Sequence, residues 1–371
     1  MSGHTRKRAR LDPEIAASNL EQWMKKAGPD QTCVLATVGE GDDIVEHKKD
    51  EEFWYEDGNI FLIAGDTRFR VFKGILADLS PVFKDMFSIP HPRVNTSSSK
   101  AAQLCPVVHV SDSPDELRYL LRVCFPKTGA SRYLSPDPTY DEVSALIRLG
   151  HKYQIPQLVE SSLDYLKRYY SDDLEVWAKA GRKKRPPKFR KSHAIGVVNL
   201  ARLTGCTQLL PPALLSCCLL RTDAVVAGAA REGAPGESLS LDDIRLCYLA
   251  RGKLAAAGVE TALRVCQPLV SDTCSKTLRC VVFLIELVVK LPEQADQLCT
   301  GNPFRSYADR FAFLRGKLCG SCYAMLEERD REERRAMWKK LPELLGIDVD
   351  GWAADDKDAS AAGAETSGST A

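Results

Sequence analysis

The sequence lacks the short motifs that mark most catalytic and cofactor-binding sites. It has no glycine-rich dinucleotide fingerprint, no phosphate-binding loop, no nucleophile elbow and no His-Glu-x-x-His metal motif. Histidine is scarce, and none of the six lies beside a suitable cysteine or serine signature; they are His4, His47, His91, His109, His151 and His193. These absences favour a protein that is not an enzyme and needs no cofactor.

Net charge and long apolar runs are missing as well. The 51 basic and 50 acidic side chains leave a formal charge of +1, so no overall field draws the chain to nucleic acid or to a membrane. The longest apolar run, Val281–Leu291, contains Glu286 and Lys290 and is far shorter than the roughly 20 residues that span a membrane. The basic start has no apolar segment behind it, unlike a secretory signal. We expect an intracellular chain, nuclear or cytoplasmic, whose partners are proteins rather than membranes or nucleic acid.

Cysteine is plentiful, with 13 residues between Cys33 and Cys322, but the absence of a secretory signal argues against disulfides. Most cysteines are expected to be small buried apolar residues. Only Cys319-x-x-Cys322 has the spacing of a site, and helix packing, a zinc site and a redox pair are its alternatives. We assign no metal and keep this pair as the candidate, because zinc needs two more ligands. Four cysteines could supply them by converging in the fold: Cys266, Cys274, Cys280 and Cys299.

The most regular stretch lies in the first third of the chain. Ile60–Ala64 is a run of strand formers, Gly65-Asp66 is a two-residue turn signal, and Thr67–Phe72 alternates apolar and polar residues. Apolar residues at helical spacing follow these strands. Ser80-Pro81 is then an N-cap with proline at the first helical position. This stretch predicts a hairpin followed by two helices.

Two further helices have clear starting points. Ser113-Pro114-Asp115-Glu116 and Thr139-Tyr140-Asp141-Glu142 are capping boxes, each followed by apolar residues at helical spacing. Val107–Val110 is predicted to be a strand before the first box, and a helix is expected after Pro156.

These residues together resemble the BTB (POZ) domain. The family pattern runs as a strand ending in Gly-Asp, then Phe-x-Val-His-Lys, Ile-Leu-Ala, Ser-Pro-x-Phe and Met-Phe, with a later Lys-Tyr-x-Ile and Tyr-Leu. Phe72 stands where the family usually has a structural histidine. The resemblance covers about Phe53 to Tyr170 and implies an α+β domain, a small sheet with surrounding helices, that pairs with itself or docks other proteins. The signature residues are Gly65, Asp66, Phe69, Val71, Lys73, Leu76, Ser80, Pro81, Phe83, Phe87 and Tyr153.

Two basic segments are candidates for a nuclear-import signal. One lies near the start, and the other is a loop whose prolines exclude a continuous helix. A solvated tail or linker is the alternative for both, and phosphate binding is a further alternative for the loop. The residues are Arg6, Lys7, Arg8, Arg10, Arg182, Lys183, Lys184, Arg185, Lys188, Arg190 and Lys191.

Helical periodicity dominates from Ala194 onward, which predicts an all-α C-terminal domain. Helices are expected at Ala194–Leu203, from Pro211, at Leu241–Ala257, at Thr273–Val289 and from Asn302. The fourth is apolar nearly all round, which predicts a central position. The last is expected to be one long helix with solvated i,i+4 pairs, Glu327 with Arg331 and Asp330 with Arg334.

Short motifs of this region are similar to the helical region that follows the BTB domain in proteins of mushroom-forming (basidiomycete) fungi. They are Asn199-Leu200-Ala201-Arg202, Leu210-Pro211-Pro212-Ala213-Leu214, Cys319-Gly320-Ser321-Cys322 and Trp338-Lys339-Lys340-Leu341-Pro342.

The chain as a whole is expected to contain five segments. They are a mostly flexible tail at 1–52, with a short helix possible at Leu11–Lys26, a BTB/POZ domain at 53–171, a basic linker loop at 172–193, a helical domain at 194–347 and a disordered tail at 348–371.

Three functions fit this organisation. The main prediction is a non-catalytic scaffold or adaptor that self-associates, as a possible homodimer, or docks protein partners through an apolar patch. A substrate adaptor of a cullin-type ubiquitin ligase is an alternative, although Met86-Phe87 is followed by Ser88-Ile89-Pro90-His91-Pro92 without the expected glutamate. A nuclear, chromatin-associated regulator is another, although no DNA-reading motif accompanies the basic loops.

Overall fold

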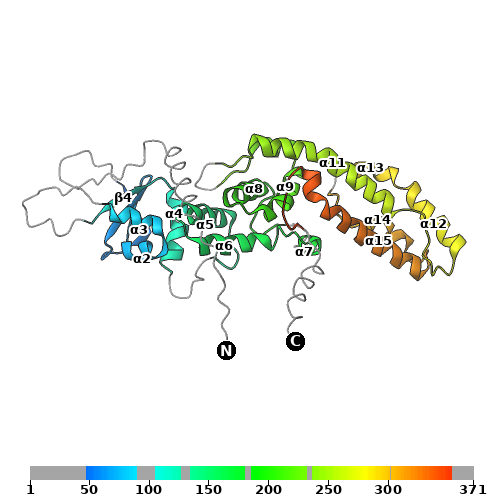
Figure 1. The fold of residues 1–371 in the computed structure, drawn as a ribbon, viewed down its shortest axis with the longest axis horizontal. Coiled ribbons are helices and arrows are strands. Elements are labelled where there is room, and N and C mark those ends of the chain that lie inside the picture. The colour runs from blue at the N-terminus through cyan, green and yellow to red at the C-terminus, as the bar shows by residue number, and fades with distance from the viewer. Residues whose placement is uncertain are drawn as a thin grey trace, which may run out of the picture. The chain divides into compact units, whose positions relative to one another are not determined.

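In the computed structural model the chain forms two compact units, residues 1–127 and 128–371. The structure describes residues 47–89, 105–126, 134–179, 185–231, 236–300 and 302–352. Figure 1 draws their helices and strands, coloured in chain order. The helix expected at Leu11–Lys26, most of the tail expected at 1–52 and residues 353–371 lie outside the described residues. The predicted domain limits stay predictions.

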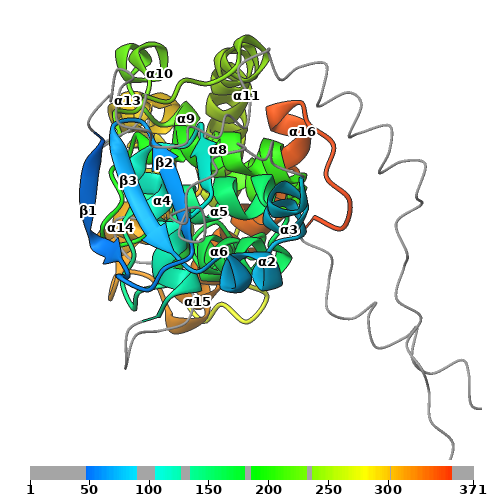
Figure 2. The same cartoon turned by 90° about the vertical axis from the view of Figure 1, so that its left-hand side faces the viewer.

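The described residues of the first unit form a four-stranded mixed sheet. Its strands are β1 (Lys48–Trp54), β2 (Ile60–Ala64), β3 (Thr67–Val71) and β4 (Val107–Val110), in the order β1-β3-β2-β4. β2 and β3 form the predicted antiparallel hairpin, whereas β1 pairs parallel to β3 and β4 parallel to β2. Figure 2 shows β1, β3 and β2 side by side.

Strand β1 begins inside the segment that was predicted to be a flexible tail. Its sequence is mostly charged, which hides the strand, but Asp50 and Phe53 are buried. The Asp50 carboxylate accepts hydrogen bonds from the backbone N–H groups of Glu52 and Phe53 and from Arg118 Nε at 2.7 Å. The strand thus depends on a partner 68 residues away, which a local pattern does not reveal.

The helices of the first unit confirm the predicted starting points. They are α2 (Lys73–Leu79), α3 (Pro81–Ser88) and α4 (Pro114–Cys124). Ser80 Oγ accepts the Phe83 N–H at 3.1 Å, and Ser113 Oγ accepts the Glu116 N–H at 3.2 Å. Both serines therefore satisfy backbone donors that a helix start leaves free.

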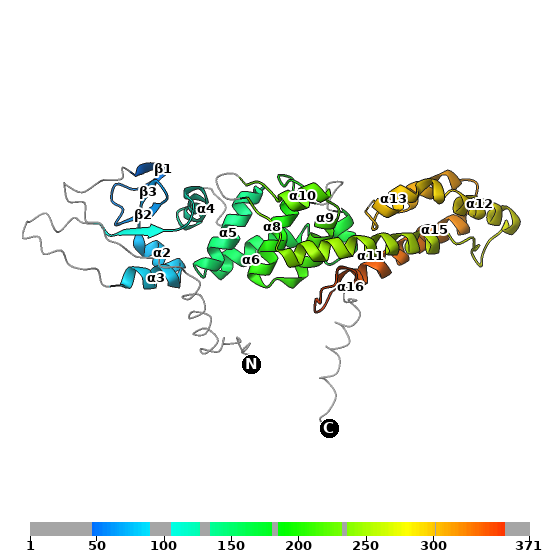
Figure 3. The same cartoon turned by 90° about the horizontal axis from the view of Figure 1, so that it is seen from above.

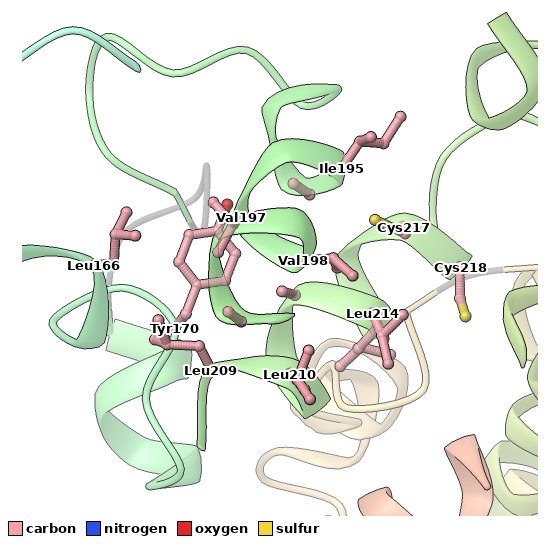
Figure 4. Packing of buried hydrophobic residues seen from close by; sticks show 14 of the residues in the cluster. Leu166, Tyr170, Ile195, Val197, Val198, Leu209, Leu210, Leu214, Cys217 and Cys218 are labelled. Carbon is pink, nitrogen blue, oxygen red and sulfur yellow. The ribbon is translucent and has the colours of Figure 1, made fainter. Parts of the chain in front are cut away.

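The first part of the second unit is a bundle of helices with one continuous apolar core. Its elements are α5 (Tyr140–Lys152), α6 (Pro156–Lys167), α7 (Leu174–Lys179), α8 (His193–Thr204), the 3-10 turn η2 (Thr207–Leu209), α9 (Leu210–Cys218) and α10 (Thr222–Ala227). Leu166 of α6, Val197 of α8 and Leu214 of α9 belong to this core, part of which is drawn in Figure 4. The core joins α5 and α6 to the helices that follow them.

The second part of this unit is built on two long helices. Its elements are α11 (Leu241–Val265), α12 (Thr277–Val289), η3 (Pro292–Gln294), α13 (Ala295–Thr300), α14 (Ala308–Phe311), η4 (Ala312–Leu314), α15 (Gly320–Lys339) and α16 (Leu341–Leu345). Figure 3 shows α11 and α15 side by side. A smaller apolar cluster, which includes Leu284, Phe311 and Leu326, lies among α11, α12, α14 and α15.

Three expectations for this region are wrong. The long helix expected from Asn302 is interrupted, because Gly316 has a φ of 79° that an α-helix does not contain, and α15 begins only at Gly320. The pair Asp330 and Arg334 forms, but its side chains are only 4% and 10% exposed, so it is not solvated. Helix α12 is not central either, since one of its faces is open to solvent.

Candidate functional site

The predicted signature residues of the hairpin form its turn and its buried face. Gly65 has a φ of 55°, a left-handed conformation that side chains disfavour. The Asp66 carboxylate next to it accepts a hydrogen bond from Thr67 Oγ1 at 3.0 Å. Phe69 and Val71 are fully buried on β3. These four signature residues therefore shape the hairpin.

The remaining signature residues hold the helix pair and the end of α5. Leu76 and Phe83 are fully buried, and Phe87 stacks on Phe83 with ring centroids 5.7 Å apart. The Lys73 N–H donates to Asn59 Oδ1 at 2.8 Å, which joins the start of α2 to the turn before β2. Ser80 and Pro81 begin α3, and Tyr153 caps the end of α5 and is buried. All of these residues have structural roles.

Phe72, at the position where the family usually has histidine, lies in an aromatic cluster. Its ring centroid lies 5.2 Å from that of Tyr55 and 6.5 Å from that of Phe125, and the latter two rings are 5.6 Å apart. A phenyl ring packs here without needing a hydrogen-bond partner, so the departure from the family pattern is accommodated by local packing.

The described part of the basic loop is anchored to the fold. Arg185 Nε donates to the Phe189 carbonyl at 2.5 Å, and Lys188 Nζ donates to the Asp137 carbonyl at 2.7 Å. The Arg190 N–H donates to Nδ1 of His193 at 3.1 Å, whereas the Lys191 side chain is exposed. The other predicted import residues, 6–10 and 182–184, lie outside the described residues, so import stays a prediction.

Four cysteines converge where α12 and α15 begin. Cys319 and Cys322, the predicted candidate pair, lie with Cys274 and Cys280, and the four Sγ atoms all lie within 4.8 Å of one another. The other two cysteines considered for this group, Cys266 and Cys299, are not part of it. The signal in the sequence was a second closely spaced pair, Cys274-x5-Cys280, upstream of Cys-x-x-Cys.

The backbone around this cluster separates the proton affinities of two of its thiols. Hydrogen bonding from the Cys322 backbone N–H is the largest of the effects that lower the pKa of Cys319 to about 6. Burial raises the pKa of the Cys322 thiol to about 12. The Cys319 thiol therefore gives up its proton more readily than the Cys322 thiol.

A second feature that the sequence did not reveal is the outer face of α12. Leu278, Val282, Ile285 and Val289 are 88%, 63%, 48% and 68% exposed. We refer to these four residues as the α12 stripe. The separations of these four residues, 4, 3 and 4 positions, can be found in the sequence. The inner face of the helix is equally apolar, however, so the sequence predicts a helix that is buried on all sides.

The mixed sheet, the capped pair of helices α2 and α3, and the buried signature residues define a small α+β domain without a catalytic role for any signature residue. Residues 55–169 match the family model of the BTB/POZ domain, so the chain contains a BTB/POZ domain, a non-catalytic module for protein–protein interaction, including homodimer formation. The predicted fold class, this domain followed by a helical C-terminal region, is confirmed. No curated protein matches the sequence. Within the described residues, no helix is both long and apolar enough to cross a membrane.

Proposed function

We propose that the chain is a non-catalytic protein-interaction adaptor with two binding surfaces. The BTB/POZ domain supplies one surface and self-associates or docks a protein, as members of its family do. The α12 stripe in the second unit supplies the other and is the observation that carries this proposal. Such an adaptor links a protein bound by the BTB/POZ domain to a second protein bound by the α12 stripe.

The α12 stripe has the character of an interface rather than of scattered surface residues. Its four side chains lie along one face, while the opposite face, with Cys280, Leu284 and Leu287, is buried. Single exposed apolar residues are ordinary, but a contiguous apolar row marks a docking surface.

The chemistry of the partner follows from the spacing. Residues separated by 4, 3 and 4 positions repeat as the a and d positions of a coiled-coil seam do. The row from Leu278 to Val289 is about 17 Å long at a rise of 1.5 Å per residue, which matches three turns of a second helix. We therefore propose an amphipathic helix of another protein as the occupant.

The finer alternatives differ in what the BTB/POZ domain contacts. A cullin scaffold is a candidate, weakened by the missing glutamate after Phe87. A chromatin-associated role in the nucleus depends on the basic segments near residues 6–10 and 182–191. The short helical-region motifs support the basidiomycete type of BTB protein. A plain scaffold, in the nucleus or the cytoplasm, requires neither feature.

The experiment compares partner capture by three versions of the tagged full-length chain. Leu278→Glu places a charge in the stripe, and Leu241→Glu does the same to a leucine that is 85% exposed at the start of α11. Proteins that are captured by the wild type and by Leu241→Glu but lost with Leu278→Glu support the proposal, provided that α12 amides gain hydrogen-exchange protection when such a protein is added.

Capture that does not differ between the two variants would contradict the role of the stripe. The mass of the purified chain in solution separates this result from self-association. A dimer that persists in Leu278→Glu is attributed to the BTB/POZ domain, whereas a dimer lost only in that variant means that the stripe binds a second copy.

A further inference from the structure

The cysteine cluster joins two segments that are distant in sequence. Cys274 lies in the loop before α12 and Cys280 in the first turns of that helix, while Cys319 precedes α15 and Cys322 lies in its first turn. The Sγ atoms of Cys274 and Cys319 are 3.7 Å apart although 45 positions separate the residues. Most other cysteines of the described residues are buried singly or in pairs, as apolar packing predicts.

We propose that these four cysteines bind one zinc ion. Structural zinc sites are tetrahedral, with Zn–S bonds of about 2.3 Å, which places the sulfur atoms about 3.8 Å apart along the edges of the tetrahedron. The 3.7 Å separation of Cys274 and Cys319 equals such an edge, and all four sulfur atoms lie close enough to share one ion after small side-chain adjustments.

Backbone N–H groups around the cluster favour anionic sulfur. The Cys319 N–H donates to Cys280 Sγ, and the Ser271 N–H donates to Cys322 Sγ, both at 3.4 Å. Zinc ligands are thiolates, and donors around the ligands orient them and stabilise their charge. Two sulfur atoms from different pairs thus already have the outer hydrogen bonds that a zinc–thiolate site requires.

The charge of the flanking segments suits the same ion. Four thiols lose their protons when they bind Zn²⁺, which leaves a complex with a net charge of −2. Residues 270–282 and 313–324 contain four basic side chains and one acidic side chain, Asp272, a balance of +3. The basic residues are Lys276, Arg279, Arg315 and Lys317.

The site would be structural. Four protein ligands fill a tetrahedral zinc ion and leave no position for substrate or water. The apolar cluster around it is small, and α12 contributes only Cys280, Leu284 and Leu287 as fully buried residues. A metal that ties the start of α12 to the start of α15 compensates for this small core. Zinc binding involves only the cysteines and does not depend on a partner of the α12 stripe.

The first test is the metal content of the full-length chain, purified with a thiol reductant and without chelators. We expect one zinc per chain by elemental analysis, and a shell of four sulfur atoms by X-ray absorption at the zinc edge. A mercurial reagent that blocks thiolates should release this zinc completely. These measurements on the unaltered chain do not depend on whether a variant folds.

Variants then identify the ligands. Cys274→Ser and Cys319→Ser should each lose most of the zinc, whereas Cys299→Ser, which changes an exposed cysteine outside the cluster, should keep it. Zinc that is retained in Cys319→Ser would overturn the assignment of ligands. A chain without zinc, a chain with iron in its place, or a Cys274–Cys319 disulfide in the freshly purified protein would overturn the zinc site itself.

Discussion

The buried pair Asp330 and Arg334 on α15 offers the sharpest test of how the second unit is stabilised. The Asp330 carboxylate accepts hydrogen bonds from Arg334 Nε and Nη2 at 3.1 and 3.0 Å. It also accepts from Ser306 Oγ at 2.7 Å and from the Tyr307 N–H at 3.0 Å. One carboxylate thus joins α15 to the segment that leads into α14.

Replacement of Asp330 by alanine should be strongly destabilising. It leaves the guanidinium of Arg334, whose side chain is 10% exposed, without its carboxylate, and removal of one partner of a buried pair costs about 3–5 kcal/mol. The Tyr307 N–H is buried and loses its acceptor as well, which places the expected loss toward the upper end of that range.

The matched control is an exposed pair with the same i,i+4 spacing. Arg305 and Asp309 are 2.9 Å apart, and their side chains are 70% and 78% exposed. Asp309→Ala should therefore change the free energy of unfolding by less than about 1 kcal/mol. Urea unfolding followed by tryptophan fluorescence measures both variants, because Trp177, Trp338 and Trp352 all belong to the second unit.

The double variant Asp330→Ala with Arg334→Ala completes the thermodynamic cycle. If the large cost comes from an unpaired buried charge, removal of Arg334 as well should recover part of it. If Asp330→Ala lowers the free energy of unfolding no more than Asp309→Ala does, the reasoning is refuted. That result would mean that burial of the Asp330–Arg334 pair adds nothing to its contribution to stability.

Three further predictions concern single side chains. His193 is buried, its Nδ1 accepts the Arg190 N–H, and burial is the largest of the effects that lower its pKa to about 4. Because the unfolded chain therefore binds a proton more readily than the folded chain, the stabilisation from neutral His193 is fully present above pH 6.5 and falls toward pH 4. In urea unfolding, the wild type should lose about 1 kcal/mol more than His193→Gln between pH 7 and 5, partial solvent screening included. Gly196→Ala should destabilise the second unit strongly, visible as a lower midpoint in thermal unfolding, because a Cβ there would lie 1.6 Å from the Tyr140 hydroxyl oxygen; an unchanged midpoint would contradict that packing. Ser113→Ala should cost about 1 kcal/mol through loss of the cap at the Glu116 N–H, whereas Ser113→Asp should retain most of it.

Much of the fold was predictable because its signals are local. Ser80, Ser113 and Thr139 each bond to an N–H three residues ahead, so sequence alone placed the starts of α3, α4 and α5. The Gly65-Asp66 turn is equally local, since its geometry depends on the φ of one glycine. Such interactions operate between neighbours in the chain, and a short window of sequence contains all the partners.

The candidate sites were predicted only in part, because their members come from distant segments. Cys-x-x-Cys identified Cys319 and Cys322, but only the fold selected Cys274 and Cys280 over Cys266 and Cys299. The 4-3-4 row of α12 was readable, yet both faces of that helix are apolar, and hydropathy does not say which face is covered.

The amino-acid sequence by itself determined the BTB/POZ signature, the helix starts and the helical character of the C-terminal region, since each follows from backbone propensity and from residues within a few positions of one another. Tertiary structure alone decided that Asp50 and Asp330 are buried beside arginines, that four sulfur atoms meet, and that the α12 stripe is exposed. Burial and pairing depend on which distant surfaces pack together. That packing sums many weak contacts along the whole chain, and no short pattern encodes it.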